Sequence, residues 1–305
     1  MITTGVVICT HLDERLEQLA QAVESVENQT RKPDEVIVVV DGTADLLAKV
    51  EARLPGRRVL GMGHNQGLSH ARNQAVAALS AELIFFLDDD AVAGPDWIEQ
   101  LVDAVGPDVL GASGRSDPIW IGPRPAWLPD EFLWIVGCSY KGQPVTRHPV
   151  RNVYGGCCAL RRILFTELGG YDESLGKGTQ AAGGGEEAQL CLRAHTQWPE
   201  AQFVHDPTAF IQHRVPGDRL TWTYALRRSY GEGVVKARMA KRQHGALAPE
   251  RSFATALPRA LGNALAAGAR GDAAALRRAG GLVALSTAVL SGMVVGSLNS
   301  GSHRL

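Results

Sequence analysis

The chain has 305 residues, and 45% of them are hydrophobic, which allows one large α/β domain or two smaller ones and excludes a largely disordered chain. The 31 Lys and Arg residues nearly balance the 32 Asp and Glu residues, so the net charge of -1 gives no global attraction to nucleic acid. The five cysteines show no paired zinc spacing, and the N-terminus lacks a charged signal region. We therefore expect a cytoplasmic protein with reduced thiols and no nucleic-acid partner.

Strands and helices alternate along the first third of the chain. Strands are predicted over residues 5–10, 35–40, 58–61 and 83–87, and helices over residues 16–29, 44–54 and 68–79. The strand over residues 35–40 is almost continuously Val and Ile, which is typical of a strand covered on both faces. The alternation predicts an α/β fold with a mostly parallel, twisted sheet flanked by helices. Polar residues that follow such strands face one crevice and are candidates for binding one ligand.

Three consecutive carboxylates, Asp88, Asp89 and Asp90, follow the strand over residues 83–87. Like charges this close together are tolerable only in water or against a cation, and a divalent ion with oxygen ligands would hold them together. The sequence therefore predicts a metal site at the end of this strand. A solvated acidic turn is the alternative.

Polar residues also follow the first two strands. Thr10 and His11 follow the first, and Asp41 follows the second. Asp41 would accept hydrogen bonds from a nucleobase or ribose, or it would cap the following helix. Arg72 lies near the start of the third helix, where a guanidinium would add to the positive end of the helix dipole in holding phosphate. A surface ion pair is the alternative for Arg72.

A second candidate centre is the run GGGEE over residues 183–187. Glycines allow the backbone to approach a ligand closely, and the helix that follows carries Glu186 and Glu187 in its first turn. Carboxylates are also favoured there by the helix dipole alone, which is the alternative. His213, after an apolar run, is either a third metal ligand or a core histidine bonded to a backbone carbonyl.

The chain resembles the family 2 glycosyltransferases of the GT-A fold in four segments, which occur in the order VVICTHLDER, VIVVVDG, NQGLSHARN and FFLDDDA. The resemblance continues through GGCCALRR, GGYDESLG, GGGEEAQLCLR and IQHRVPGDRLTWTYALRRSYGEGVVKA, and it covers roughly residues 6–237. It implies an inverting sugar transfer assisted by Mn²⁺ or Mg²⁺, from a nucleotide-sugar donor to a hydroxyl acceptor whose identity the sequence does not give. A UDP-sugar is the expected donor.

The resemblance also implies roles for individual residues. Asp88 and Asp90 would form the metal-and-ribose element, and the base would be Glu187, with Glu186 in reserve. Residues 154–162 would form the floor of the sugar pocket, where Cys157 and Cys158 replace the Asn, Met or Ala of related sequences and are expected only to pack. The candidates for donor binding are Thr10, His11, Asp41, Arg72, Asp88, Asp89 and Gly156, those for the metal are Asp90, Asp88 and His213, and those for catalysis are Glu187 and Glu186.

Residues 115–152 interrupt the strand-helix rhythm with several Trp and Pro residues, and we expect an irregular lid or acceptor-side insert. Trp120 and Trp134 would stack on a sugar ring or pack the insert against the sheet. The expected domains are a glycosyltransferase domain over residues 1–237, with a nucleotide half over about 1–114 and an acceptor half over about 115–237. A helical C-terminal extension would follow over residues 238–305.

The C-terminal tail leaves two alternatives open. Residues 279–302 contain no charged residue, but their many small side chains make them a poor membrane-spanning helix. They would form a packing element or a subunit interface in a homo-oligomer, with Gly292 and Gly296 allowing close approach. Alternatively, the basic residues upstream, over residues 227–242, would hold the protein peripherally on the anionic cytoplasmic membrane face, beside a lipid-linked acceptor.

Two other functions compete with sugar transfer. A sugar nucleotidyltransferase would carry a Gly-rich basic loop after the first strand, and CTHLDERL is not one. A non-catalytic nucleotide-sugar-binding protein would not need both acidic runs of this chain, DDD at residues 88–90 and EE at residues 186–187.

Overall fold

The structure, a computed structural model, describes residues 2–174, 184–242 and 248–298, with residues 242 and 248–254 described by their backbone alone. The chain divides into two compact units. The first unit comprises Met1–Asp117, Pro144–Thr179 and Gly185–His213, and the second comprises Pro118–Gln143, Gln180–Gly184 and Arg214–Leu305. The expected boundary at residue 237 falls inside a long helix of the second unit.

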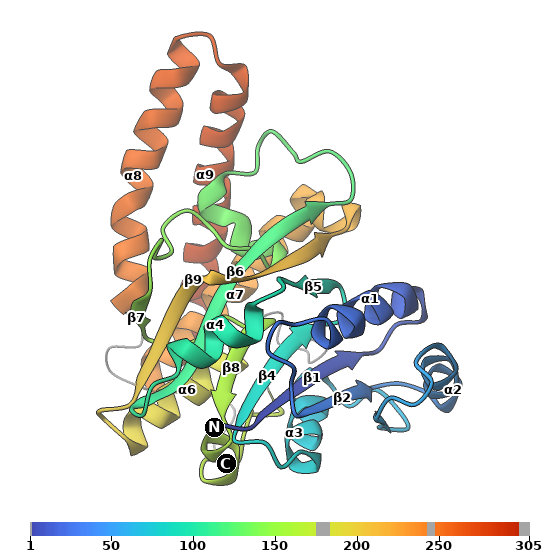
Figure 1. The fold of residues 1–305 in the computed structure, drawn as a ribbon. Coiled ribbons are helices and arrows are strands. Elements are labelled where there is room, and N and C mark those ends of the chain that lie inside the picture. Colours follow the sequence, from blue (N-terminus) through green and yellow to red (C-terminus); the bar gives the residue numbers. More distant parts are fainter. Residues whose placement is uncertain (1, 175–183, 243–247, 299–305) are drawn as a thin grey trace. The chain divides into compact units, whose positions relative to one another are not determined.

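The elements follow one another as Figure 1 shows. The first half of the chain contains β1 (Thr4–Thr10), the 3-10 helix η1 (Asp13–Arg15), α1 (Leu16–Glu27), β2 (Glu35–Val40), α2 (Ala44–Arg53), β3 (Val59–Gly61), α3 (Leu68–Ala78), β4 (Leu83–Asp88), β5 (Ala91–Ala93), α4 (Trp97–Ala104) and β6 (Val109–Trp120). The second half contains η2 (Asp130–Val136), β7 (His148–Val150), β8 (Cys157–Arg161), α5 (Ile163–Thr166), α6 (Glu186–Gln197), β9 (Gln202–Val215), η3 (Gly217–Leu220), α7 (Trp222–Arg242), α8 (Ala248–Ala269) and α9 (Ala273–Leu298).

The strands form one mixed sheet in the order β3-β2-β1-β4-β8-β6-β9-β5, with β7 paired to β9. The expected parallel arrangement holds for β3, β2, β1 and β4. Parallel neighbours need a crossover connection, and α1, α2 and α3 provide it. β8 runs antiparallel to both β4 and β6, and β9 runs antiparallel to β5, so this half of the sheet is antiparallel.

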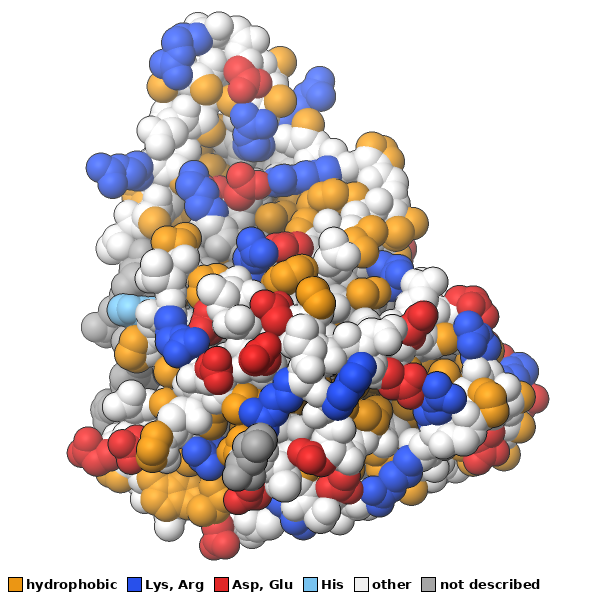
Figure 2. Space-filling model, viewed as in Figure 1, with side chains coloured by type: hydrophobic (Ala, Val, Ile, Leu, Met, Phe, Trp, Pro, Cys, Tyr) orange, Lys and Arg blue, Asp and Glu red, His pale blue; other side chains and the backbone are white. Residues whose placement is uncertain are grey.

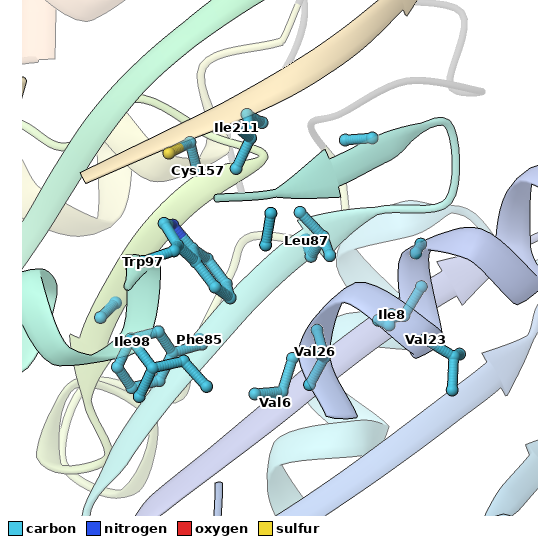
Figure 3. Packing of buried hydrophobic residues seen from close by; sticks show 14 of the residues in the cluster. Val6, Ile8, Val23, Val26, Phe85, Leu87, Trp97, Ile98, Cys157 and Ile211 are labelled. Carbon is cyan, nitrogen blue, oxygen red and sulfur yellow. The ribbon is translucent and has the colours of Figure 1, made fainter. Parts of the chain in front are cut away.

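Alternate residues of the central strands point to the two faces of the sheet. Phe85 and Leu87 of β4 lie in one hydrophobic core with residues of α1 and α4, whereas Phe86 lies in a second core with residues of α3, α5 and α6. Figure 3 shows the first core, in which Phe85 meets Trp97 edge to face with ring centroids 5.2 Å apart. Helices on both faces explain why the strands lack the polar alternation of a half-exposed sheet.

The second unit is organised around the close contact of α7 and α9. A Cβ atom on Gly292 would lie 2.0 Å from the carbonyl oxygen of Tyr230, and one on Gly296 would lie 2.8 Å from that of Val234. On the facing helix, a Cβ atom on Gly233 would lie 2.0 Å from the carbonyl oxygen of Val289. These glycines let the two backbones touch, as expected for the packing alternative at Gly292 and Gly296, and they make α7 part of the second unit.

The tryptophans of the insert contact other residues of the second unit. Trp127 stacks on Trp222 of α7 at 4.1 Å between ring centroids. The guanidinium of Arg228 and the ammonium of Lys236, both on α7, lie over the ring of Trp134. The guanidinium of Arg124 lies over the ring of Trp120. Trp120, Trp127 and Trp134 all pack against the hydrophobic core of this unit. Packing thus accounts for these side chains, and a role of Trp120 and Trp134 in sugar stacking stays a prediction.

Helix α9 is apolar on more than one face. Within the described ranges it is the one helix long and apolar enough to cross a membrane, and 28% of its most apolar 18-residue window is buried. Its side away from α7 exposes Val283, Leu290 and Val294, at 53%, 62% and 58%. Residues 299–302 of the predicted uncharged tail lie outside the described residues.

Candidate active site

The acidic cluster lies where β4 ends, and pairing of β5 with β9 brings a histidine to it. The antiparallel register sets Ala91 opposite His213, so His213 lies next to Asp90, and its Nε2 atom is 3.3 Å from Asp90 Oδ1. One ligand atom each from Asp88, Asp90 and His213 lies within 4.8 Å of the others. Asp90 and His213 are each only 3% exposed, so the alternative of a solvated acidic turn does not describe this cluster.

These three residues fit a divalent cation by their chemistry. Two carboxylate oxygens suit Mg²⁺ or Mn²⁺, and an imidazole nitrogen shifts the preference towards a transition ion. Gly156, in the turn directly before β8, supports the same site, because its backbone has a φ of +79° and a Cβ atom there would lie 2.6 Å from Asp88 Oδ2. The close approach of this backbone to Asp88 requires glycine.

The middle carboxylate of the cluster, that of Asp89, contacts Arg15. Its Oδ1 atom accepts a hydrogen bond of 2.6 Å from Arg15 Nη1, and the same nitrogen lies 3.1 Å from Asp90 Oδ2. Burial raises the pKa of Asp89, although the charge of Arg15 acts in the opposite direction. Asp89 thus lies in a buried ion pair with Arg15 of η1, and its role in donor binding stays a prediction.

Arg72 joins the acidic cluster to the second candidate centre. Its Nη2 atom lies 3.2 Å from Asp88 Oδ1, and its Nη1 atom donates to Glu187 Oε1 at 2.8 Å. The guanidinium also lies over the rings of Phe86 and Tyr171. The Arg72 side chain is 5% exposed, so its ion pairs are buried and the alternative of a surface ion pair is wrong.

The two glutamates begin α6, after Gly185 with a φ of +118°. Burial, with the neighbouring charge of Glu186, raises the pKa of Glu187 to about 7, and the charge of Arg72 only partly offsets this. Gly155 makes room for Glu187, because a Cβ atom there would lie 2.1 Å from Glu187 Oε1. A carboxylate with a pKa near neutrality is suited to accept a proton in a reaction at physiological pH. Gly183 of the GGGEE run lies outside the described residues.

Asp41 holds the loop before α3. Its carboxylate oxygens accept hydrogen bonds from the backbone N–H groups of Gln66 and Gly67, at 2.7 and 2.9 Å. The capping alternative for Asp41 on the following helix is wrong, because Thr43 is the N-cap of α2. The Asp41 N–H donates to the carbonyl oxygen of Thr10 at 2.8 Å, so both strand ends meet as predicted.

The remaining candidates differ in accessibility. Thr10 is buried, and His11 is exposed at the end of β1. Cys157 and Cys158 point into the two opposite cores of the sheet, which agrees with packing. Burial raises the pKa of Cys157 to about 12, which leaves its thiol protonated at neutral pH. Arg15 could not be predicted as a partner of the acidic cluster, because a charged residue in a short helix is usually solvated.

Comparisons with known proteins identify the family of this chain. The profile of glycosyl transferase family 2 matches residues 5–169. The glucosyl-dolichyl phosphate glucuronosyltransferase of Haloferax volcanii is 33% identical over 237 residues, which are 76% of this chain and 75% of that protein. The succinoglycan biosynthesis protein ExoM of Rhizobium meliloti is 25% identical over 251 residues, covering 78% of this chain and 75% of that protein. The chain belongs to glycosyl transferase family 2.

A solved structure supports the same fold. The mannosyltransferase PcManGT of Pyrobaculum calidifontis, in complex with GDP-Man and Mn²⁺, superimposes with a TM-score of 0.62 at 17% identity. The match covers 99% of this chain and 88% of that one. This chain is therefore a glycosyltransferase with a nucleotide-sugar-binding GT-A fold.

Proposed function

We propose that this enzyme catalyses metal-assisted, inverting transfer of a sugar from a nucleotide-sugar donor to a hydroxyl acceptor. The observation that carries the proposal is the buried link from Asp88 through Arg72 to Glu187, which ties a cation-binding cluster to a carboxylate whose pKa is about 7. Direct displacement at the sugar carbon needs one base and no protein nucleophile, and Glu187 is a carboxylate with a suitably raised pKa.

Each residue has a role in this mechanism. Asp88, Asp90 and His213 would hold Mn²⁺ or Mg²⁺, which supplies charge compensation for the departing diphosphate when bound. Glu187 accepts the proton of the acceptor hydroxyl at a carboxylate oxygen as that hydroxyl attacks the sugar. Arg72 holds the unprotonated form of Glu187 in place and offers a guanidinium to the diphosphate.

The donor we propose is a UDP-sugar, bound by the loops that carry Thr10, Asp41 and Gly156. The related structure was solved with GDP-Man, so a GDP-sugar must be tested as a donor as well. Purified protein would be titrated with UDP-glucose, UDP-glucuronic acid and GDP-mannose, each with Mn²⁺, Mg²⁺ or excess chelator, and its thermal unfolding followed. Stabilisation that requires both a cation and one donor supports the proposal. Equal stabilisation in chelator contradicts the metal-assisted mechanism.

A matched variant makes the metal test specific. Asp90→Asn keeps the size of the side chain but removes one ligand charge, and it should abolish cation-dependent donor binding while the protein stays folded. Arg53→Gln, which breaks an exposed ion pair with Glu17, is the control and should behave like wild type. Product analysis by NMR would give the anomeric configuration, and a retained configuration would contradict inversion.

We further propose that the acceptor is a lipid-linked sugar and that the second unit holds the enzyme peripherally on the cytoplasmic membrane face. The name of the relative from Haloferax volcanii includes glucosyl-dolichyl phosphate, a lipid-linked sugar. Residues 222–298 contain eleven Lys or Arg and three Asp or Glu, which is a basic balance in a chain of net charge -1. In the view of Figure 2, the end of the α8–α9 pair carries mostly Lys and Arg among its charged side chains. Exposed apolar and basic side chains together favour an anionic lipid surface.

Flotation with anionic and neutral liposomes tests this membrane contact. Wild type should float with anionic vesicles at low salt, and the Leu290→Asp, Val294→Asp double variant should not. Both side chains are exposed, so the double variant should remain folded. A second copy of the chain is the alternative partner for the exposed apolar side chains of α9. If wild type fails to float and light scattering shows a dimer that the same variant dissociates, the homo-oligomer replaces the membrane.

A further inference from the structure

Arg15 is an arginine inside the acidic cluster that no candidate role includes. Its Nη1 atom contacts both Asp89 Oδ1 and Asp90 Oδ2, at 2.6 and 3.1 Å. Its side chain is 18% exposed, and those of the two aspartates are each 4% exposed. The ion pairs are therefore shielded from water. In such a shielded site a charge acts more strongly on its neighbours than it does at the surface.

The two oxygens of Asp90 have different partners. Oδ2 lies against Arg15, whereas Oδ1 lies 3.3 Å from His213 Nε2 on the side of the ligand cluster. Asp89 belongs to the arginine side of this arrangement, because the cluster of possible ligands comprises Asp88, Asp90 and His213. Arg15 thus occupies the side of the carboxylates opposite to the one that a cation would use.

We propose that Arg15 is a positioning residue that sets the affinity of the Asp88, Asp90 and His213 site for a divalent cation. The positive charge of Arg15 offsets part of the negative charge of the carboxylates and keeps the affinity for a free cation low. This inference rests on the proposed metal site, and it adds a residue outside the ligand set that tunes it.

The charge of Arg15 leads to a signed expectation. Removing one positive charge near a divalent ion strengthens binding of that ion. Across a few ångströms the effect is about tenfold even at the dielectric of water, so a shielded site should show at least this much. A purely structural arginine gives the opposite result, because its loss would misplace Asp90 and weaken binding. The sign of the change therefore separates the two roles.

The experiment uses the full chain and Mn²⁺ alone, with free Mn²⁺ followed by electron paramagnetic resonance. Arg15→Gln should bind Mn²⁺ about tenfold more tightly than wild type. Arg15→Lys keeps the charge and should stay within about threefold of wild type. Arg53→Gln removes an arginine whose ion pair with Glu17 is exposed, and its affinity should be unchanged. An unchanged or weaker affinity of Arg15→Gln would overturn the proposal.

A charge-compensating pair keeps the test decisive if Arg15→Gln folds poorly. Asp89→Asn leaves Arg15 with one carboxylate fewer, so it should weaken Mn²⁺ binding by about tenfold although Asp89 is not in the ligand set. The double variant Arg15→Gln, Asp89→Asn restores the local charge and should return to within about threefold of wild type. If Asp89→Asn leaves Mn²⁺ binding unchanged, or the double variant binds more weakly than Asp89→Asn alone, the role is structural and the proposal fails.

Failure of this inference can be told apart from failure of the metal site. If wild type binds Mn²⁺ and Asp90→Asn does not, the metal site stands, and an unaltered affinity in Arg15→Gln overturns the role of Arg15 alone. If neither wild type nor Arg15→Gln binds Mn²⁺ at millimolar concentrations, both the metal site and the role of Arg15 are overturned.

Discussion

Arg72 Nη1 donates to Glu187 Oε1 at 2.8 Å, across 115 positions of the chain. The same guanidinium lies 3.2 Å from Asp88 Oδ1. One buried cation therefore touches both the acidic cluster and the candidate base. A donor diphosphate that attracts Arg72 would loosen its hold on Glu187, so occupancy of the donor site and the reactivity of the base are physically linked.

Glu187→Gln should leave donor affinity unchanged within about threefold and lower the rate of transfer by about 10² to 10⁴, the range expected for loss of a general base. The amide cannot accept the proton, but it keeps the size of the side chain and a hydrogen-bond acceptor for Arg72. Single-turnover rates and donor titrations measure the two effects separately.

Glu186→Gln is the control for that variant. Glu186 is 3% exposed and lies 3.8 Å from Arg72 Nη1, so it acts on Glu187 mainly through its charge. We expect a loss of about tenfold or less for Glu186→Gln. An inactive Glu186→Gln beside an active Glu187→Gln would exchange the two roles.

The transfer rate should rise with pH through about 7, because burial raises the pKa of Glu187 from 4.5 to about 7 and only its ionised form accepts a proton. Initial rates between pH 5.5 and 8.5 at fixed metal and donor test this, and Glu187→Gln should lack the inflection. A wild-type profile that is flat across this range would mean that the base lies elsewhere.

The same pKa shift predicts a pH-dependent gain in stability for Glu187→Gln. A carboxyl whose pKa is raised on folding contributes its full stability below about pH 4.5 and loses it as pH rises through about 7. Glu187→Gln stays neutral, so its unfolding free energy should match wild type near pH 4 and exceed it near pH 8, by up to about 3 kcal/mol. Urea unfolding at the two pH values measures the difference, and an equal difference at both would contradict the shift.

Gly156→Ala should impair metal and donor binding. A Cβ atom at Gly156 would lie 2.6 Å from Asp88 Oδ2, so the carboxylate must move, and the φ of +79° adds strain of about 1 kcal/mol. Gly56→Ala is the matched control, because Gly56 has a φ of +75° with no atom within 4 Å of its Cβ position. Gly156→Ala should lose at least as much stability as Gly56→Ala in urea unfolding, and only Gly156→Ala should lose Mn²⁺-dependent donor binding. Equal donor binding in both would remove the role of Gly156.

Two adjacent glycines of α9 should respond oppositely to alanine. A Cβ atom at Gly281 would lie 1.9 Å from the carbonyl oxygen of Trp127, so Gly281→Ala should destabilise the protein by about 1 to 3 kcal/mol. No atom lies within 4 Å of the Cβ position of Gly280, and alanine in an exposed helix is favoured by up to about 1 kcal/mol. Thermal unfolding of the two variants compares them directly, and a Gly281→Ala variant as stable as Gly280→Ala would contradict the packing of α9.

Much of the first unit was predictable because its signals are local. Short apolar runs predicted β1, β2 and β4 to within one residue at each end, and the polar residues that end these runs predicted the sheet edge where Asp41 and Asp88 lie. The antiparallel half of the sheet was not predictable, because β5 has three residues and pairs with β9, more than a hundred residues later.

The sequence by itself determined the family, the order of strands and helices in the nucleotide half, and the residue types of the candidate site, because these depend on near neighbours and on motif spacing. Only the tertiary structure decided that Asp89 faces Arg15, that Arg72 is buried between Asp88 and Glu187, and that the pKa of Glu187 lies at about 7. Each of these depends on which charges, far apart in the chain, lose their water together, and desolvation of that kind follows from the packed fold alone.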